Sequence, residues 1–350
     1  MKKKITISDI ARELNTTAST VSRALSDDSR ISKAKKKLVW KKVSELQYQP
    51  NSIASALRKG KSNVIGVIVP TSDRQFFASF IRGIEEIVRE EGYRLIICQS
   101  DEQYDKECTS IDSLLNIRVD GIIASVAKNT VDFSHFKKIE SQGVPLVLFD
   151  RVIETMNVNL VYSDDYYGAY RAVSHLIEQG CRRIAHFAGK QHIHIYQNRL
   201  KGYLQAIRDH HLPVDDELII ETDLIHDTYS ILEIGKVLAK KLSEMPERPD
   251  AIFSSSDFAA MGALQFFKEN NIAVPDEMAL VGYSNDFSSS VIEPSLTTLD
   301  QHTSHMGNEA ARHFLYQIIT KPEYFKPRKT LLKPELVIRN SSLRRNVIPA

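Results

Sequence analysis

The sequence has few of the features that mark secreted, membrane or metal-binding proteins. Among its 350 residues are three cysteines, Cys98, Cys108 and Cys181, which are odd in number and lack CxxC spacing. They predict neither a disulfide framework nor a zinc site. No stretch approaches the roughly 20 apolar residues of a membrane span, and the basic segment 1–4 is not followed by the apolar run of a signal peptide. We therefore expect a cytoplasmic protein that binds no membrane, metal or other cofactor.

Motifs of catalytic and nucleotide-binding sites are also scarce. The sequence contains neither GxSxG nor GxGxxG, and Ala188-Gly189-Lys190 lacks the first glycine of a P-loop. The pairs His192-x-His194 and His210-His211 suggest a metal at first sight, but no carboxylate or cysteine stands at partner spacing. An enzyme is therefore the least supported class of function.

What the chain does have is a strong basic excess at one end. Residues 1–63 contain 15 Lys and Arg against 5 Asp and Glu, a formal charge of +10. The whole chain has 46 against 44, so residues 64–350 have 31 against 39, a formal charge of −8. A basic region confined to one part of the chain is the electrostatic footprint of nucleic-acid binding, since each phosphate neutralised by Lys or Arg releases counterions.

The basic segment predicts two short helices joined by a tight turn. Thr6, with Asp9 three residues on, is a plausible N-cap of the first helix, and Thr17 is a plausible N-cap of the second. Apolar residues recur at helical spacing in both: Ile10, Ala11 and Leu14, then Val21, Ala24 and Leu25. The pattern favours a helix-turn-helix, in which the second helix enters the major groove. A third helix is expected from about Ser32 to Leu46, with lysines outward and Trp40, the only Trp, as a partly buried prop.

A short hinge-like segment follows this bundle. Pro50 ends the third helix, and Asn51 can cap a further helix of about two turns, which is too short to be stable alone. Three stretches then resemble the DNA-binding head and hinge of the LacI/GalR (lac repressor) family: Thr6-Ile7-x-Asp9-Ile10-Ala11, Thr20-Val21-Ser22-Arg23-Ala24-Leu25 and Tyr48-x-Pro50-Asn51-x-x-Ala54-x-x-Leu57. The resemblance covers the whole head.

The resemblance implies roles for single residues of the head. Ala18 and Ser19 at the front of the second helix and Arg23 at its end would read bases in the major groove, with only apolar contact from Ala18. Leu57, with Ala54 beside it, would enter the minor groove at the operator centre and kink the duplex, the alternative being a core residue of a linker helix. The further candidates for DNA contact are Thr6, Thr17, Thr20, Ser22, Asn51 and Arg58.

From residue 63 onward, short apolar strands alternate with amphipathic helices, which predicts an α/β fold with parallel sheets. Strands are expected at 64–69, 94–98, 121–125 and 145–149, and in a second series at 183–188, 218–220, 251–254 and 278–283. Two such series predict two lobes, with the ligand in the cleft beyond the carboxyl ends of the strands. This region resembles the periplasmic-binding-protein-like effector domain of the same family.

The expected domains are a helix-turn-helix head at 1–49, a hinge helix and linker at 50–62, and an effector-binding and dimerisation domain at 63–340. The resemblance implies three passages between the lobes, near 161–164, 292–296 and 321–326. The first lobe would then hold about 64–161 and 296–321, and the second about 162–292 and 325–340. Crossing strands of this kind allow hinge closure around a ligand.

Candidates for effector binding follow the expected strands: Phe76, Phe77, Ser125, Asp150, Arg199, Ser256, Asp257 and Ser284. The resemblance implies that Phe77, with Phe76 beside it, stands where relatives place an aromatic ring over the ligand. The alternative is that one of the pair faces the core, and Phe76 could equally be that one. Asp150 would accept from ligand hydroxyls, unless it is bonded to Arg151 or to its own loop. Arg199 stands in the Arg-x-x-Gly-aromatic pattern that in this family points a guanidinium into the cleft, where its donors suit vicinal hydroxyls or a carboxylate.

Three positions near the expected cleft leave alternatives open. Gly282-Tyr283 is followed by Ser284, where relatives usually have aspartate, so the acidic contact is missing or displaced. His302 stands where relatives have proline. Asp257 starts a helix, and is equally a ligand contact or a capping carboxylate.

These observations predict a DNA-binding transcriptional regulator, in the first instance a repressor, controlled by a small-molecule effector, in the first instance a carbohydrate. The expected partners are pseudo-palindromic double-stranded operator DNA and a second copy of the chain. Residues 341–350 contain no heptad segment of the kind that builds tetramers. The alternative is a solute-binding or sensing module without DNA function, which the basic head argues against. Inducer and corepressor action both stay open.

Overall fold

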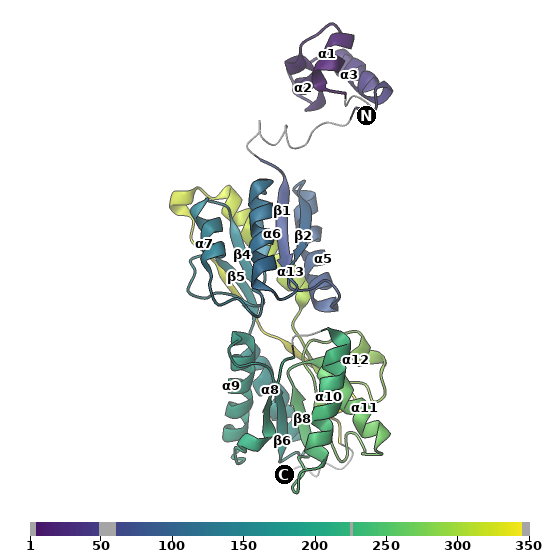
Figure 1. Cartoon of the computed structure of the whole chain (residues 1–350), viewed down its shortest axis with the longest axis vertical. Coiled ribbons are helices and arrows are strands. Elements are labelled where there is room, and N and C mark those ends of the chain that lie inside the picture. Colours follow the sequence, from purple (N-terminus) through teal and green to yellow (C-terminus); the bar gives the residue numbers. More distant parts are fainter. Residues whose placement is uncertain (1–4, 49–60, 225–226, 345–350) are drawn as a thin grey trace. The chain divides into compact units, whose positions relative to one another are not determined.

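The computed structural model describes residues 5–48, 61–224 and 227–344. The chain divides into two compact units, Met1–Ser62 and Asn63–Ala350, called the head and the body below (Figure 1). Four hinge candidates lie outside the described residues, and their roles stay predictions: Asn51, Ala54, Leu57 and Arg58.

The described part of the head, residues 5–48, contains three helices: α1 (Ile7–Glu13), α2 (Ala18–Leu25) and α3 (Lys33–Glu45). Thr6 and Asp9 close a capping box on α1, and Thr17 and Ser32 cap α2 and α3 with their side-chain oxygens. The buried side chains form one small core: Ile10, Ala11, Val21, Ala24, Val39 and Val43. The helix-turn-helix predicted from capping residues and apolar spacing is confirmed.

Trp40 is not the partly buried prop that the sequence suggested, since 51% of it is exposed. Val39 and Val43 face the core of the head. Trp40 is one residue further along α3, which turns its indole about 100° away from Val39. It is therefore a surface side chain, and the body has no tryptophan at all.

The first lobe of the body is built on a six-stranded parallel sheet in the order β11-β5-β4-β3-β1-β2. Its strands are β1 (Val64–Val69), β2 (Arg94–Gln99), β3 (Gly121–Ala124), β4 (Leu146–Phe149), β5 (Asn159–Ser163) and β11 (Lys329–Leu332). Successive side chains point to opposite faces. Ile65 and Val67 lie in a core with residues of α5 (Gln75–Glu90) and α13 (Thr303–Ile319), and Ile68 lies in another with α6 (Tyr104–Asn116) and α7 (Ser134–Ser141).

The second lobe has a four-stranded parallel sheet in the order β7-β6-β8-β9. Its strands are β6 (Ile184–Ala188), β7 (Ile219–Glu221), β8 (Ala251–Ser254) and β9 (Ala279–Val281). One core joins the sheet to α8 (Asp165–Glu178) and α9 (His194–Asp209), and the other joins it to α10 (Thr228–Ser243) and α11 (Asp257–Glu269). The short elements of this lobe are η1 (Asp216–Leu218) and α12 (Ser288–Val291), whereas η2 (Pro322–Tyr324) precedes β11 in the first lobe. Both lobes thus have the α/β pattern predicted, and among the described helices none has the length and apolar character to span a bilayer.

The second passage between the lobes lies later in the chain than the predicted 292–296. Leu296 and Leu299 are buried in the cores of the second lobe. Thr297 pairs with Val281 at the end of β9, and β10 (Thr298–Asp300) continues from there. The chain therefore returns to the first lobe only after Asp300, just before α13. A strand of three residues carries too little periodicity to assign its sheet from sequence.

The third passage was also predicted too early, near 321–326. β11 pairs in parallel with β5 in the sheet of the first lobe, and β12 (Glu335–Val337) pairs antiparallel with β10. The crossing thus lies between β11 and β12, and the segment before it belongs to the first lobe. The first passage follows β5, near the predicted 161–164.

Candidate functional site

α2 presents the residues that the sequence assigns to DNA reading. Ser19 and Arg23, four residues apart on one face of the helix, are exposed, whereas Ala18 and Ser22 are partly buried. The cap fixes the front of the helix, because Thr17 Oγ1 accepts the backbone N–H of Thr20 at 3.2 Å. The same oxygen lies 3.2 Å from Ser19 Oγ and 2.9 Å from Thr20 Oγ1.

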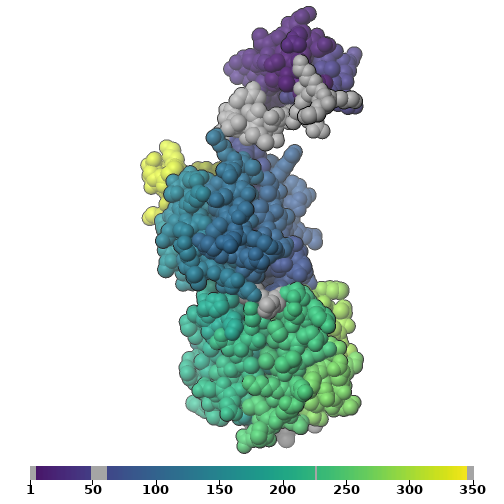
Figure 2. Space-filling model, viewed as in Figure 1, coloured from purple at the N-terminus to yellow at the C-terminus, as the bar shows by residue number. Residues whose placement is uncertain are grey.

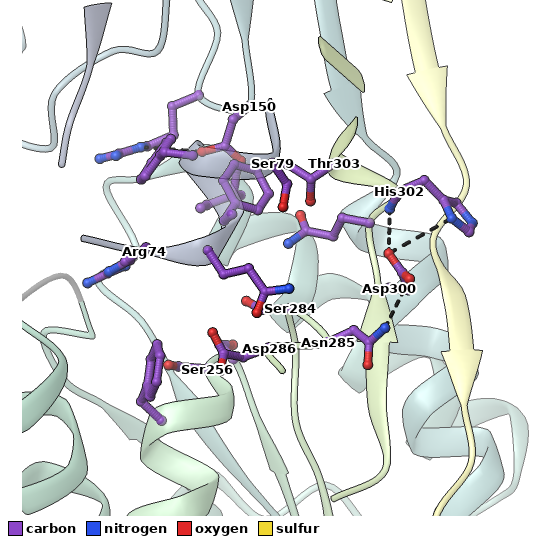
Figure 3. Close-up of a pocket in the computed structure, with 18 of the residues that line it drawn as sticks. Arg74, Ser79, Asp150, Ser256, Ser284, Asn285, Asp286, Asp300, His302 and Thr303 are labelled. Atoms are coloured by element: carbon purple, nitrogen blue, oxygen red, sulfur yellow. Dashed lines mark hydrogen bonds and ion pairs between the residues drawn. The ribbon is translucent and has the colours of Figure 1, made fainter. Parts of the chain in front are cut away.

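A cavity of about 460 Å³ lies between the two lobes of the body. It is lined by the start of α5, by residues that follow β4, β8 and β9, by α9, and by the segment between β10 and α13. This is the edge of an α/β sheet at which ligands bind, and the volume suits a small molecule. Six of the eight candidates line the cavity: Phe76, Phe77, Asp150, Arg199, Ser256 and Ser284. Figure 3 shows Asp150 on one side of it and Ser256 and Ser284 on the other.

Arg199 is fixed by the protein itself. Its Nε donates to Asp165 Oδ1 at 2.8 Å, and its Nη1 donates to the carbonyl of Ser255 at 2.9 Å. Burial by itself would lower the pKa of Arg199, but the carboxylate of Asp165, together with Tyr283 and Tyr196, more than offsets burial and raises the pKa above the ordinary value. Two of the five N–H donors are thus used internally, and at most three can serve a ligand.

Asp150 is a buried carboxylate in the wall of the cavity, with 8% of the residue exposed. Its backbone is in the left-handed region, at a φ of 56°. Arg151 forms a long ion pair with Asp150, with Nε 3.8 Å from Oδ2, while its two Nη atoms bind Glu102 at 2.7 and 2.8 Å. Burial raises the pKa of Asp150 to about 6, and the charge of Arg151 offsets only part of that effect.

Both phenylalanines at the start of α5 line the cavity. Phe77 is the more buried, at 4% exposed, and packs edge-on against Phe149 of β4 with a centroid distance of 6.4 Å. Phe76 is only partly buried and lies edge-on to Phe77 at 5.1 Å. Phe76 is therefore the ring of the pair with more surface left for a ligand.

Comparison with known proteins gives the family. Residues 6–51 match bacterial regulatory proteins of the lacI family, and residues 62–339 match the periplasmic binding proteins and sugar binding domain of the LacI family. This chain belongs to the LacI family. It is a DNA-binding transcriptional regulator with a helix-turn-helix head and an effector domain, as the sequence predicted.

Individual proteins of the LacI family are similar to this chain over almost its entire length. The HTH-type transcriptional repressor PurR of Actinobacillus pleuropneumoniae is 30% identical over 336 residues, which are 96% of this chain and 98% of PurR. A structure of the transcriptional regulator CelR–cellobiose complex has 25% identity and a TM-score of 0.71, covering 96% of this chain and 99% of that one. The lac repressor dimer bound to operator and the anti-inducer ONPF shares the fold, with a TM-score of 0.82, 23% identity, and coverage of 97% and 100%.

Two of the eight candidate effector-binding residues, Asp257 and Ser125, do not line the cavity of this LacI-family protein. Asp257 is buried and accepts hydrogen bonds from Thr298 Oγ1 (2.5 Å), Ser289 Oγ (2.8 Å) and the backbone N–H of Asp286 (2.9 Å). Its carboxylate therefore ties the loop after β9 to β10. Ser125 is fully buried, and its backbone N–H donates to the carbonyl of Ile68, which extends the sheet and keeps the hydroxyl beneath the surface.

The loop that follows the Gly282-Tyr283 pair brings three polar side chains to the cavity. Ser284, Asn285 and Asp286 all line the cavity. Asn285 is engaged elsewhere, since its Nδ2 donates to Asp300 and its Oδ1 accepts from Arg339. Asp286 Oδ1 accepts from the backbone N–H of Ser288 at 3.0 Å. Asp286 therefore adds a carboxylate to the cavity wall.

Ser255 and Gln301 were missed by the sequence analysis. Both line the cavity at 3% exposure. Ser255 Oγ and Gln301 Oε1 are buried without a hydrogen-bond partner among the described residues. A buried polar atom without a partner is costly, so these two atoms are natural contacts for a ligand or an ordered water. The sequence contains only weak signals for them. Ser255 is the middle of three consecutive serines, and Gln301 lies where the chain passes between the lobes, a passage that was predicted at 292–296.

Proposed function

We propose that this chain is a cytoplasmic, homodimeric repressor without catalytic activity, which binds a pseudo-palindromic operator and changes its operator affinity when a neutral polyhydroxylated effector, such as a sugar, fills the inter-lobe cavity. The observation that carries the effector class is the mixture of groups in the cavity wall. Carboxylates, amide groups and hydroxyls supply acceptors and donors, and Phe76 supplies an apolar face. A sugar is bound through all three kinds of group: hydrogen-bond acceptors, hydrogen-bond donors and an apolar face.

The proposal assigns separate tasks to the lining residues. Asp150, from the first lobe, accepts ligand hydroxyls, and Arg199, from the second, donates to ligand oxygens. Gln301 and Ser255 fill their missing hydrogen bonds with the same ligand. Because the contacts come from both lobes, binding favours the closed arrangement. The cellobiose in the related CelR structure supports the class of ligand, not its identity.

In the head, we propose that Ser19 and Arg23 read base edges and that Leu57 provides the minor-groove wedge. Ala18, Thr17, Thr20, Ser22 and Thr6 would complete the contacts as positioning or phosphate-binding groups. The pairing of heads in a dimer makes the operator palindromic. The dimer in the lac repressor structure supports this arrangement.

The first test is selection of bound sequences from random duplex DNA by the purified full chain at two salt concentrations. An enriched palindrome, bound with a steep loss of affinity as salt rises, is the expected result. The operator then serves as the probe for a panel of neutral sugars and, as a control class, nucleobases. If no palindrome is enriched with any member of the panel present, the operator-binding proposal is wrong. If a nucleobase and no sugar alters operator binding, the effector class is wrong.

A further inference from the structure

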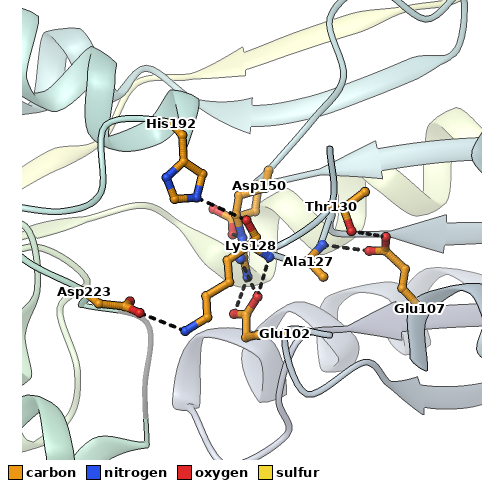
Figure 4. Close-up of polar contacts among 9 residues, drawn as sticks. Glu102, Glu107, Ala127, Lys128, Thr130, Asp150, His192 and Asp223 are labelled. Carbon is orange, nitrogen blue, oxygen red and sulfur yellow. Dashed lines mark hydrogen bonds and ion pairs between the residues drawn. The ribbon is translucent and has the colours of Figure 1, made fainter. Parts of the chain in front are cut away.

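The two lobes of the body are joined by a side chain on one side of the cavity. Lys128, in the loop after β3 of the first lobe, places its Nζ 3.0 Å from Oδ2 of Asp223, which follows β7 of the second lobe. His192, in the loop after β6 of the second lobe, has its Nε2 3.3 Å from the backbone carbonyl of Lys128. Figure 4 shows both contacts. In the space-filling view the first lobe, in blue, and the second, in green, meet along this boundary (Figure 2).

The loop that carries Lys128 is itself held in place. Glu107 of α6 is fully buried, and it accepts from the backbone N–H of Ala127 and from Thr130 Oγ1, both at 2.7 Å. The side chains of the ion pair are partly shielded, at 17% exposed for Lys128 and 31% for Asp223. A positioned and partly buried pair is screened less than a surface pair and loses less side-chain freedom on forming.

Glu102 connects this ion pair to the cavity. Its two carboxylate oxygens accept from Arg151 at 2.7 and 2.8 Å, and one of them also accepts the backbone N–H of Lys128 at 2.9 Å. Arg151 lines the cavity. Asp101 and Glu102 are both in the left-handed region, with φ of 49° and 60°, a conformation that non-glycine residues keep only where the surroundings enforce it.

We propose that Lys128 and Asp223 form an inter-lobe latch that favours the closed cleft before any effector binds, and that Glu102 is the positioning residue that ties the latch to the cavity through Arg151. The second half of this inference rests on the proposed effector site, and the first half does not. The latch supplies part of the free energy that closes the cleft, even without an effector. A larger fraction of the free protein is then closed, and the apparent affinity for the effector rises in proportion to that fraction.

A third contact between the lobes provides a reporter of closure. The backbone N–H of Phe287, at the start of α12 in the second lobe, donates to Gln75 Oε1 of α5 in the first lobe at 2.6 Å. Phe287 is 68% exposed, and its N–H has no other hydrogen-bond acceptor among the described residues, so protection of this amide depends on the bond between the lobes. Its rate of hydrogen exchange in the effector-free full chain therefore measures how often the lobes part.

The latch is tested by residue-resolved hydrogen exchange of the effector-free protein. Lys128→Ala and Asp223→Ala should each speed exchange at Phe287 by about five-fold, the factor expected for a partly shielded pair. The double variant should add little to either, and the charge exchange Lys128→Asp with Asp223→Lys should restore much of the protection. Amides of β1 control for global unfolding.

A matched control is available within one lobe. Lys138 Nζ lies 2.6 Å from Asp112 Oδ1, and both residues belong to the first lobe. Lys138→Ala should leave exchange at Phe287 unchanged, because no contact between lobes is lost. If Lys128→Ala and Asp223→Ala match this control, the latch is refuted, whatever the effector turns out to be.

The link to the cavity needs its own variant. Arg151→Lys keeps the positive charge but cannot bind both oxygens of Glu102, and it leaves Lys128 and Asp223 intact. We expect faster exchange at Phe287 in Arg151→Lys and in Glu102→Gln. Faster exchange only at the Lys128 amide would reduce Glu102 to a local loop contact and refute the tie, while the latch itself would stand on the ion-pair variants.

Discussion

The guanidinium carbon of Arg199 lies 3.6 Å from the centroid of the Tyr283 ring. Tyr283 is fully buried at the end of β9, so the ring cannot move aside. With Asp165 and the Ser255 carbonyl also bound to Arg199, three partners from separate elements hold one side chain. The second-lobe side of the cavity is therefore organised before a ligand arrives, which reduces the entropy lost on binding.

Arg199→Lys should weaken the body without affecting the head. A lysine keeps the charge but loses the planar stacking and cannot reach both Asp165 and Ser255 as the fork does. We expect the free energy of unfolding of the body to fall by roughly 2–4 kcal/mol, because a buried carboxylate loses its matched partner. Circular dichroism follows the body, and the fluorescence of Trp40, the only Trp, follows the head. Equal stability of the two proteins would contradict this account of Arg199.

Arg199→Ala should abolish the response to the effector while operator binding by the apo protein is kept, because the head has its own core. Calorimetry with a sugar identified by the operator screen measures effector binding directly. Unchanged affinity in Arg199→Ala would remove Arg199 from the site.

Asp150→Asn should stabilise the protein at neutral pH and not in acid. The pKa of Asp150 is raised from 3.8 to about 6 in the folded protein, so folding favours the protonated form. As pH rises from 3.8 to about 6, ionisation of Asp150 therefore lowers the free energy of unfolding, and the loss reaches about 3 kcal/mol above pH 6. Asparagine tolerates the left-handed backbone at this position and carries no charge.

The check is denaturant unfolding of both proteins between pH 4 and pH 8. The gap in stability should open between pH 4 and pH 6, stay constant above that, and vanish near pH 4. A gap that is independent of pH would mean that Asp150 is not the titrating group.

The sequence was informative where one element contains its own signal. Thr17 and its helix spacing predict α2, and the Arg-x-x-Gly-aromatic pattern locates Arg199 in the wall of the cavity. Contacts between elements were not accessible, because they depend on how the sheets bring distant residues together. Glu102 is 49 positions before Arg151, and nothing in the local sequence of either residue connects them. The presence of Asp286 in the cavity wall was inaccessible for the same reason, since it depends on the path of one loop.

Leu57→Ala should weaken operator binding by about ten-fold or more, because an alanine is too short to wedge open a base step and the kink that wraps the DNA is lost. The thermal stability of the body should not change, since the substitution lies in the other unit. A gel-shift titration on the selected operator measures the effect. Operator affinity equal to that of the wild type would rule out the wedge.

Arg23 and Lys41 should differ in what they contribute on DNA. Both are exposed in the head, Arg23 on α2 and Lys41 on α3. Arg23→Ala should cost about 1–3 kcal/mol on the preferred operator and relax the base preference at one symmetric pair of positions, because a lost base contact is sequence-specific. Lys41→Ala should instead weaken binding by a similar factor on every sequence and make it less sensitive to salt, because removing an exposed positive charge from the head reduces the number of counterions released on binding. Repeating the sequence selection with each variant separates the two effects, and an unaltered base preference in Arg23→Ala would mean that the recognition helix reads its operator through other residues.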